Sequence, residues 1–252
     1  MIPTCNLCQK SVFQDFGGRE AERCSNCGSM RRHRTAVETY RQCGMFDKDQ
    51  SAFRVLHLAP EPHISRLLME HIGMGYMPAD ACPETYTHVN ALRICLPDSL
   101  EVFPDNYFRY IVHNHVMEHV PGSFQDALLA QLRVLEVGGM LIFSVPGPKM
   151  SSETISGGEF METDEERLKV FGQIDHIKLF GKDLPGFMDE VEEAEFWFDK
   201  ISDEDRARIS VPPDSCRVMV WKKVAERKFA QINSPDKFLI GAARLRGVSS
   251  GI

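Results

Sequence analysis

Apolar and polar positions alternate along the chain in a way that predicts short buried strands taking turns with amphipathic helices. The stretches at 53–59 (FRVLHLA) and 109–115 (RYIVHNH) are apolar runs of strand length. Between them, residues 62–73 have helical spacing and stop at a glycine; the apolar positions are Ile64, Leu67, Leu68 and Ile72. The chain therefore enters its main domain as strand, helix and strand.

The same rhythm continues on both sides of these stretches. A helix is predicted at about 29–43, a short strand at 75–80, an amphipathic helix at 123–139 and a strongly apolar strand at 139–146. Ser123 suits the N-cap of the 123–139 helix, and Gly138-Gly139 suits its end. Such alternation predicts an α/β fold, a parallel sheet with helices on both faces. Ligands of such sheets bind beyond the carboxyl ends of the strands.

The later part of the chain has a different pattern. Residues 147–182 are polar and show no clear strand, which suggests a lid-like insertion. Two final strands are predicted at 193–202 and 216–224. We therefore expect a main domain at 31–224, preceded by a small unit at 1–30 and followed by a basic, weakly patterned tail at 225–252.

Charge and hydropathy narrow the function classes. The chain has 252 residues and a formal net charge of −7. This balance argues against a large surface that tracks phosphates, although a local basic patch is compatible with it. No apolar run approaches the ~18 residues that span a bilayer, and the N-terminus lacks the pattern of a signal peptide. The expected location is cytoplasmic, without membrane contact.

Four cysteines near the N-terminus form two CxxC pairs. Cys5 and Cys8 make the first pair, and Cys24 and Cys27 make the second, with fifteen residues between the pairs. Two such turns suit tetrahedral thiolate ligation of zinc, and four thiolates leave no open position for water. Two disulfides or a redox CxxC are the alternatives; a cytosolic address weighs against disulfides. We predict a structural zinc ribbon over residues 1–30.

A basic segment, GSMRRHR, follows this ribbon directly. This segment is able to bind a phosphate or another anion through Arg31, Arg32, His33 and Arg34. The alternative, slightly preferred, is a solvated helix start whose arginines pair with nearby acids.

The block at 104–146 (PDNYFRYIVHNHVMEHVPGSFQDALLAQLRVLEVGGMLIFSVP) resembles class I S-adenosylmethionine-dependent methyltransferases. More narrowly, the chain resembles a bacterial group in which a four-cysteine ribbon precedes the methyltransferase domain. The VLHLAPE stretch and the later FGQIDHIKLFG at 171–181 carry that closer resemblance. The resemblance implies a Rossmann-like seven-stranded sheet, S-adenosylmethionine as cofactor and Zn²⁺ in the ribbon. It does not identify the methyl acceptor.

The first loop departs from the family's usual acidic-x-Gly-x-Gly-x-Gly pattern. Aligned on it, His57 takes the acidic position, and Ala59, Glu61 and His63 take the glycine positions. Alanine is the smallest substitute for a glycine that lets the backbone approach the cofactor. Glu61 is then a candidate acceptor for the methionine ammonium, or else a solvated turn carboxylate.

Further cofactor positions follow from the resemblance. Asp80 ends the second strand, where the family places an acid that accepts both ribose hydroxyls; a turn-forming aspartate is the alternative. Asp98 and Ser99 lie about where an acid approaches the adenine amino group. Asn114, at the end of the 109–115 strand, is expected to line the methionine part.

The chemistry of methyl transfer singles out histidines, because the protein mainly positions the nucleophile and removes its proton. His115 lies just past a strand end, beside the expected methyl, and histidine suits this work near neutral pH. Asp175 and His176 are expected to reach over the pocket from the lid region, with Gln173 as a substrate hydrogen-bonder. Glu118 is a candidate substrate contact, and a structural role is the alternative for it and for His119.

Three functions remain open on the sequence. The first is methyl transfer to oxygen or nitrogen of a small-molecule or glycan acceptor. The second is an RNA methyltransferase that binds nucleic acid through the ribbon and residues 31–34. The third is a binding module that has kept the fold and lost the cofactor, for which the glycine-free first loop is the best support.

Overall fold

The computed structural model describes residues 2–47, 53–146, 152–213 and 215–226. Its centre is a seven-stranded sheet, and the seven-stranded Rossmann-like sheet expected above is confirmed. The strand order from edge to edge is β10 (Ala194–Phe198), β11 (Met219–Lys223), β7 (Leu135–Ser144), β6 (Phe108–Asn114), β3 (Val55–Leu58), β4 (Tyr76–Asp80) and β5 (Leu92–Arg93). The five strands from β7 to β5 are parallel, and β11 runs antiparallel to both of its neighbours.

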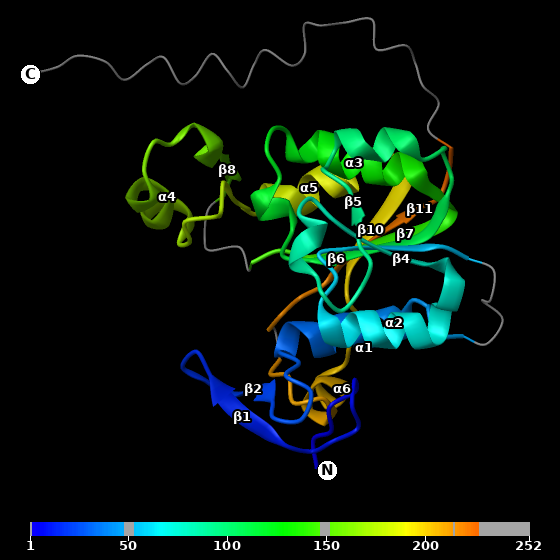
Figure 1. The fold of residues 1–252 in the computed structure, drawn as a ribbon, viewed down its shortest axis with the longest axis vertical. Coiled ribbons are helices and arrows are strands. Elements are labelled where there is room, and N and C mark those ends of the chain that lie inside the picture. Colours follow the sequence, from blue (N-terminus) through cyan, green and yellow to red (C-terminus); the bar gives the residue numbers. More distant parts are fainter. Residues whose placement is uncertain (1, 48–52, 147–151, 214, 227–252) are drawn as a thin grey trace, which may run out of the picture.

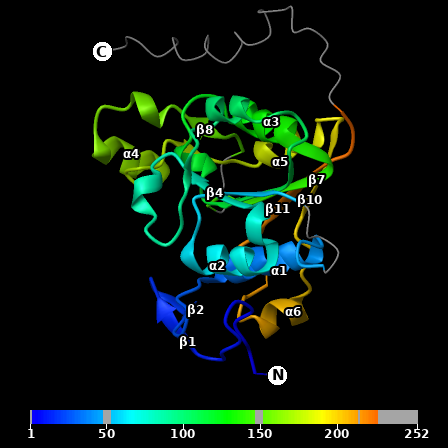
Figure 2. The ribbon, with the colours of Figure 1, turned by 45° about the vertical axis from the view of Figure 1, so that its right-hand side comes forward.

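Helices cover both faces of this sheet (Figures 1 and 2). One face carries α1 (Arg31–Gln42) and α2 (Pro62–Ile72), and the other carries α3 (Phe124–Val134) and α5 (Asp183–Asp189). Each face has its own buried apolar cluster: Leu56 and Ile111 point to the α3 side, and Val55 and Val112 point to the α1 side. The central strands are buried on both faces, which explains their continuous apolar runs.

The N-terminal unit packs beneath α1, on the side away from the sheet (Figure 1). It contains the hairpin β1 (Phe13–Phe16) and β2 (Arg19–Cys24), and α6 (Asp203–Arg208) lies beside it. Cys5, Leu7 and Cys24 belong to the same buried cluster as the inner face of α1. The ribbon therefore shares a core with the helix that follows it.

The boundary between α3 and β7 differs from the prediction. The helix was expected to run to the glycine pair, but it ends at Val134, and β7 begins at Leu135. Gly138 has φ +85°, and a Cβ on Gly139 would lie 2.9 Å from the carbonyl oxygen of Arg109 on β6. The glycines therefore allow a strand irregularity and a close backbone approach, rather than ending a helix.

The lid-like region also contains more structure than expected. Short strands β8 (Ile155–Ser156) and β9 (Lys178–Leu179) pair antiparallel, and α4 (Asp164–Phe171) lies between them in sequence. Thr163 caps α4 with a capping box, and Gly172, with φ +80°, ends it. The predicted tail at 225–252 lies outside the described residues from 227 onward.

The remaining short helices are η1 (Gly73–Gly75), η2 (Pro83–Thr85), η3 (Asp98–Val102), η4 (Met117–His119) and η5 (Gly158–Phe160). Strand order reverses between β3 and β6, so the crevice at their carboxyl ends is the expected ligand site. In the described ranges, no helix is both long and apolar enough to cross a membrane.

Candidate functional site

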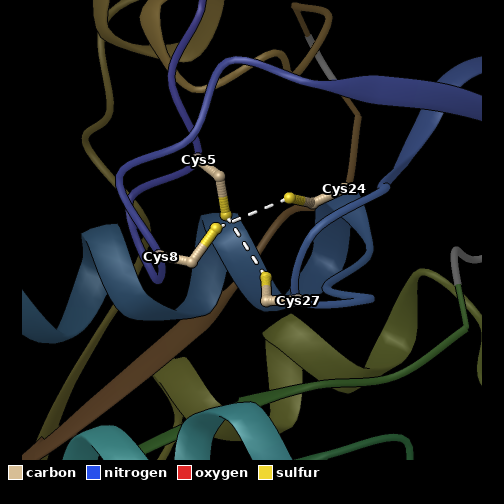
Figure 3. A group of neighbouring side chains, drawn as sticks. All are labelled: Cys5, Cys8, Cys24 and Cys27. Atoms are coloured by element: carbon tan, nitrogen blue, oxygen red, sulfur yellow. Dashed lines mark hydrogen bonds between the residues drawn. The ribbon is translucent and has the colours of Figure 1, made fainter.

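The four ribbon cysteines converge on one point (Figure 3). All four are free thiols, and their Sγ atoms all lie within 4.8 Å of one another. The Cys5–Cys27 and Cys8–Cys24 sulfur separations are 3.7 Å and 3.6 Å. A zinc ion with bonds of ~2.3 Å in tetrahedral geometry requires sulfur separations of about 3.8 Å. The donor set and its spacing therefore fit one Zn²⁺, which would cross-link the two loops.

Glu61, in the loop after β3, lies at the carboxyl ends of the central strands. Its Oε2 lies 3.0 Å from Nε2 of His57, and its Oε1 accepts a hydrogen bond of 3.2 Å from Nδ2 of Asn114. Ser144 donates to Oδ1 of Asn114 at 2.9 Å, which fixes the orientation of the amide. Strands β3, β6 and β7 thus each contribute to holding one carboxylate.

Glu61 stays ionised although its side chain is nearly buried. Its side chain is only 17% exposed. Burial acts to raise its pKa, but the hydrogen bond with His57 and nearby histidines outweigh this and bring the pKa to about 2. In the described ranges, only His57 and His33 come within ion-pair distance of it; no lysine or arginine does. This edge of the sheet therefore carries a nearly buried negative charge, and none of the described lysines or arginines forms an ion pair with it.

Two residues at the strand ends of this crevice have left-handed backbones. Ala59 follows β3 with φ +50°, and His115 follows β6 with φ +55°. Such angles cost a residue with a Cβ roughly 1–2 kcal/mol, which is why glycine is the usual occupant. Ala59 thus adopts a backbone conformation that glycine takes without strain. Unusual backbone angles of this kind cluster at functional sites.

The start of α1 reaches this loop, which the sequence did not predict. His33 is 4% exposed, and its Nε2 lies 3.6 Å from Oε1 of Glu61. Its ring also packs on His63, with centroids 4.7 Å apart. Burial lowers the pKa of His33 to about 3, so it is neutral near pH 7. Burial lowers the pKa of His63, and a hydrogen bond with the backbone of Cys27 partly opposes this, so the second CxxC pair lies beside the first residues of α2.

The predicted adenosine-side residues lie farther along the same edge. Asp80 ends β4, where Oδ1 accepts from the Cys82 amide at 2.7 Å and Oδ2 accepts from the Tyr86 hydroxyl at 3.1 Å. It therefore forms the turn anticipated as its alternative role, and each oxygen keeps a second lone pair. Asp98 is exposed in η3, and Ser99 accepts from the Cys95 amide at 3.0 Å.

Beyond β6, a buried carboxylate meets two histidines. Glu118 is 1% exposed, and neither of its oxygens has a hydrogen-bond partner among the described residues. Nδ1 of His115 and Nε2 of His176 lie 3.5 Å and 4.0 Å from its Oε1. Burial raises the pKa of Glu118 to about 8. Burial and then the charge of Arg32 lower the pKa of His115 to about 4, which keeps the imidazole neutral.

The two predicted motifs around residues 115–119 and 171–181 are brought together here. His176 is buried, and burial lowers its pKa. Asp175 lies beside His119: its backbone oxygen is 2.9 Å from Nδ1 of His119, and its carboxylate is 3.8 Å away. Gln173 is exposed in the turn after α4.

The basic segment is largely engaged inside the protein. Arg34 is fully buried and donates five hydrogen bonds to the carbonyl oxygens of Ala21, Glu22, Ser29, Ile209 and Ser210. Arg31 donates to the carbonyl of Glu20 and lies 3.6 Å from the carboxylate of Glu22. Arg34 has no donor left to bind a phosphate.

Comparisons with known proteins give structural similarity only. No family model and no curated protein matches the chain. A solved SAM-dependent methyltransferase from Archaeoglobus fulgidus is 14% identical, with a TM-score of 0.49, over 78% of this chain and 95% of that one. The 1,6-didemethyltoxoflavin-N1-methyltransferase of Burkholderia thailandensis, solved with S-adenosylhomocysteine, is 11% identical, with a TM-score of 0.47, over 77% and 79%. We therefore base the functional proposal on the chain's own residues.

Proposed function

We propose that the protein is an S-adenosylmethionine-dependent methyltransferase whose cofactor lies across the carboxyl ends of β3, β4 and β6. The observation that carries the proposal is the ionised Glu61, tied to Asn114 at the point where strand order reverses. S-adenosylmethionine is cationic at its sulfonium and at its ammonium. A nearly buried carboxylate without a lysine or arginine partner in the described ranges complements such a ligand.

The other predicted cofactor residues have compatible places in this scheme. His57 and Ala59 shape the loop around the methionine part, Asp80 accepts from the ribose with its remaining lone pairs, and Asp98 with Ser99 lie toward the adenine. The left-handed backbone of Ala59 supports a loop that still approaches the cofactor without glycine. This weighs against the alternative of a binding module that has lost the cofactor.

When bound, S-adenosylmethionine would supply the methyl group, and its sulfur would keep the electron pair of the broken carbon–sulfur bond. The acceptor's oxygen or nitrogen forms the new bond to the methyl carbon and loses its proton. His115 takes that proton in the proposal, because it follows β6 and is neutral near pH 7. We favour a small-molecule or glycan acceptor.

The RNA alternative has less support. It relied on the ribbon and residues 31–34, but Arg34 is buried and Arg31 contacts Glu20 and Glu22 of the ribbon hairpin. A net charge of −7 gives no general attraction to phosphates.

Calorimetry with three related ligands tests the role of Glu61. S-adenosylmethionine carries both cations, S-adenosylhomocysteine keeps the ammonium only, and methylthioadenosine has neither. Glu61→Gln should weaken the first two alike, by tenfold or more, since a charge-assisted hydrogen bond contributes roughly 1.5–3 kcal/mol. Methylthioadenosine should bind the variant as it binds the natural protein.

Asp80→Asn is the matched control, because it acts on the ribose that all three ligands share. It should weaken all three, by about tenfold. If Glu61→Gln weakens S-adenosylmethionine alone, the carboxylate faces the sulfonium instead. If zinc-loaded protein binds none of the three ligands, the methyltransferase proposal is wrong and the binding module takes its place.

A further inference from the structure

The cluster formed by Glu118, His119 and His176 has the composition of a metal site separate from the ribbon. One ligand atom from each residue lies within 4.8 Å of the others. Glu118 and His119 come from η4, directly after β6, and His176 comes from the loop before β9. Residues that are distant in sequence therefore bring two imidazoles and one carboxylate to the same place.

The carboxylate of Glu118 provides the second, independent observation. It is 1% exposed, and no hydrogen bond to either oxygen is formed in the described ranges. A buried carboxyl group without hydrogen-bond partners is rare, because the desolvation of its polar oxygens is not compensated. Its Oε1 instead faces Nδ1 of His115 at 3.5 Å and Nε2 of His176 at 4.0 Å, both beyond the length of a normal hydrogen bond to it. A cation shared with the imidazoles would satisfy it.

The backbone around the cluster is fixed by three consecutive links. The Ile177 amide donates to the carbonyl of Glu118 at 3.0 Å, and the carbonyl of Asp175 lies 2.9 Å from Nδ1 of His119. Lys178 donates to the carbonyl of Val120 through its ammonium. The contact at Nδ1 leaves Nε2 of His119 as the unprotonated nitrogen, an arrangement usual for a metal-bound imidazole.

We infer that Glu118, His119 and His176 form a binding site for one divalent transition-metal ion such as Zn²⁺ or Co²⁺. Two imidazoles and a carboxylate suit such ions better than Mg²⁺, which prefers oxygen ligands. Bonds of 2.0–2.1 Å would bring the ligand atoms to about 3.3 Å from one another, so the widest separation has to close by up to roughly 1.5 Å. Three protein ligands leave a coordination position open, unlike the four thiolates of the ribbon.

The inference does not depend on the proposed methyl transfer, and its test needs neither cofactor nor acceptor. Protein whose ribbon is filled with zinc is titrated with Co²⁺ and followed by visible absorption. Nitrogen and oxygen ligands should give weak d–d bands at one Co²⁺ per chain, without the intense thiolate charge-transfer bands that cobalt in the ribbon would produce. Elemental analysis should then find one zinc and one cobalt per chain.

His119→Gln is the most informative variant, because His119 lies at the surface and its replacement should leave the fold intact. It should weaken Co²⁺ binding by about 100-fold or more, since loss of even an outer-shell partner costs 10–100-fold. Glu118→Gln and His176→Gln should do the same while retaining the ribbon zinc. His71→Gln, an exposed histidine on α2, should bind Co²⁺ unchanged. Absence of a Co²⁺ spectrum in the natural protein, or one that persists in all three variants, overturns the inference.

Discussion

Arg34 offers the sharpest test of how the ribbon is held, and we predict that Arg34→Lys is strongly destabilising. The guanidinium is fully buried and donates to five carbonyl oxygens. Lysine keeps the charge but has only three donors, so at least two of the five carbonyls lose their partner. Each buried, unsatisfied carbonyl costs about 1–3 kcal/mol. Two unsatisfied carbonyls therefore cost ~2–6 kcal/mol in total. Water that enters beside the lysine satisfies part of this cost, so we expect the free energy of unfolding to fall by ~2–4 kcal/mol.

The assay is urea unfolding of zinc-loaded protein, followed by fluorescence and by release of zinc. Arg66→Lys on α2 is the control, because Arg66 is exposed and its ion pair with Glu70 has a separation of 4.0 Å. That variant should lie within about 0.5 kcal/mol of the natural protein. If Arg34→Lys unfolds at the same urea concentration as Arg66→Lys, the five carbonyl contacts do not hold the ribbon in solution.

Three further predictions concern the site. Removal of the ribbon zinc with a chelator should release about one Zn²⁺ per chain and lower the affinity for S-adenosylmethionine roughly tenfold, because Cys27 contacts the first turn of α2. Calorimetry before and after zinc is restored measures this affinity, and an unchanged value contradicts the prediction. Ala59→Gly should raise the free energy of unfolding by about 0.5–1 kcal/mol, because relief of the left-handed strain exceeds the entropy cost of glycine. Ala127→Gly in α3, the control, should lower the free energy of unfolding by at least ~1 kcal/mol. Equal losses in the two variants would show that Ala59 is unstrained. Once an acceptor is found, His115→Ala should lower turnover ~10²–10⁴-fold with cofactor affinity nearly intact, and a change of only a few-fold would exclude it as the base.

The pattern of apolar and polar residues predicted much of the fold, because burial determines which positions are apolar. Strands buried on both faces, such as β6, carry mainly apolar residues, and the neighbouring helices carry an apolar stripe toward the sheet. The glycine pair at 138–139 misled the prediction because glycine ends helices and also permits close strand contacts. The two-residue strand β5 has too few positions for any periodicity to appear.

The candidate site was predictable in kind but not in arrangement. The cysteine spacing alone indicated the ribbon, because each pair of ligands is local in sequence. The meeting of Glu118 with His176 depends on contacts across 58 positions, since 176 − 118 = 58, and no local signal reports it. The contact of His33 with Glu61 also has no local signal in the sequence. The segment that contains His33 was interpreted from its arginines alone. Burial of Arg34 could not be anticipated, since arginine is rarely enclosed completely.

The reversed strand β11 has a consequence for the order in which the molecule is completed during synthesis. It is the last described strand in sequence, yet it lies inside the sheet, between β7 and the edge strand β10. While the ribosome has not yet released residues 219–223, β7 has an open edge, and β10 has no neighbour to pair with. The carbonyls of Ile209 and Ser210 that receive Arg34 also emerge late. The nascent chain must therefore keep the apolar edge of β7 unpaired until residues 219–223 have emerged, and an unpaired edge of this kind is prone to pair with strands of other chains.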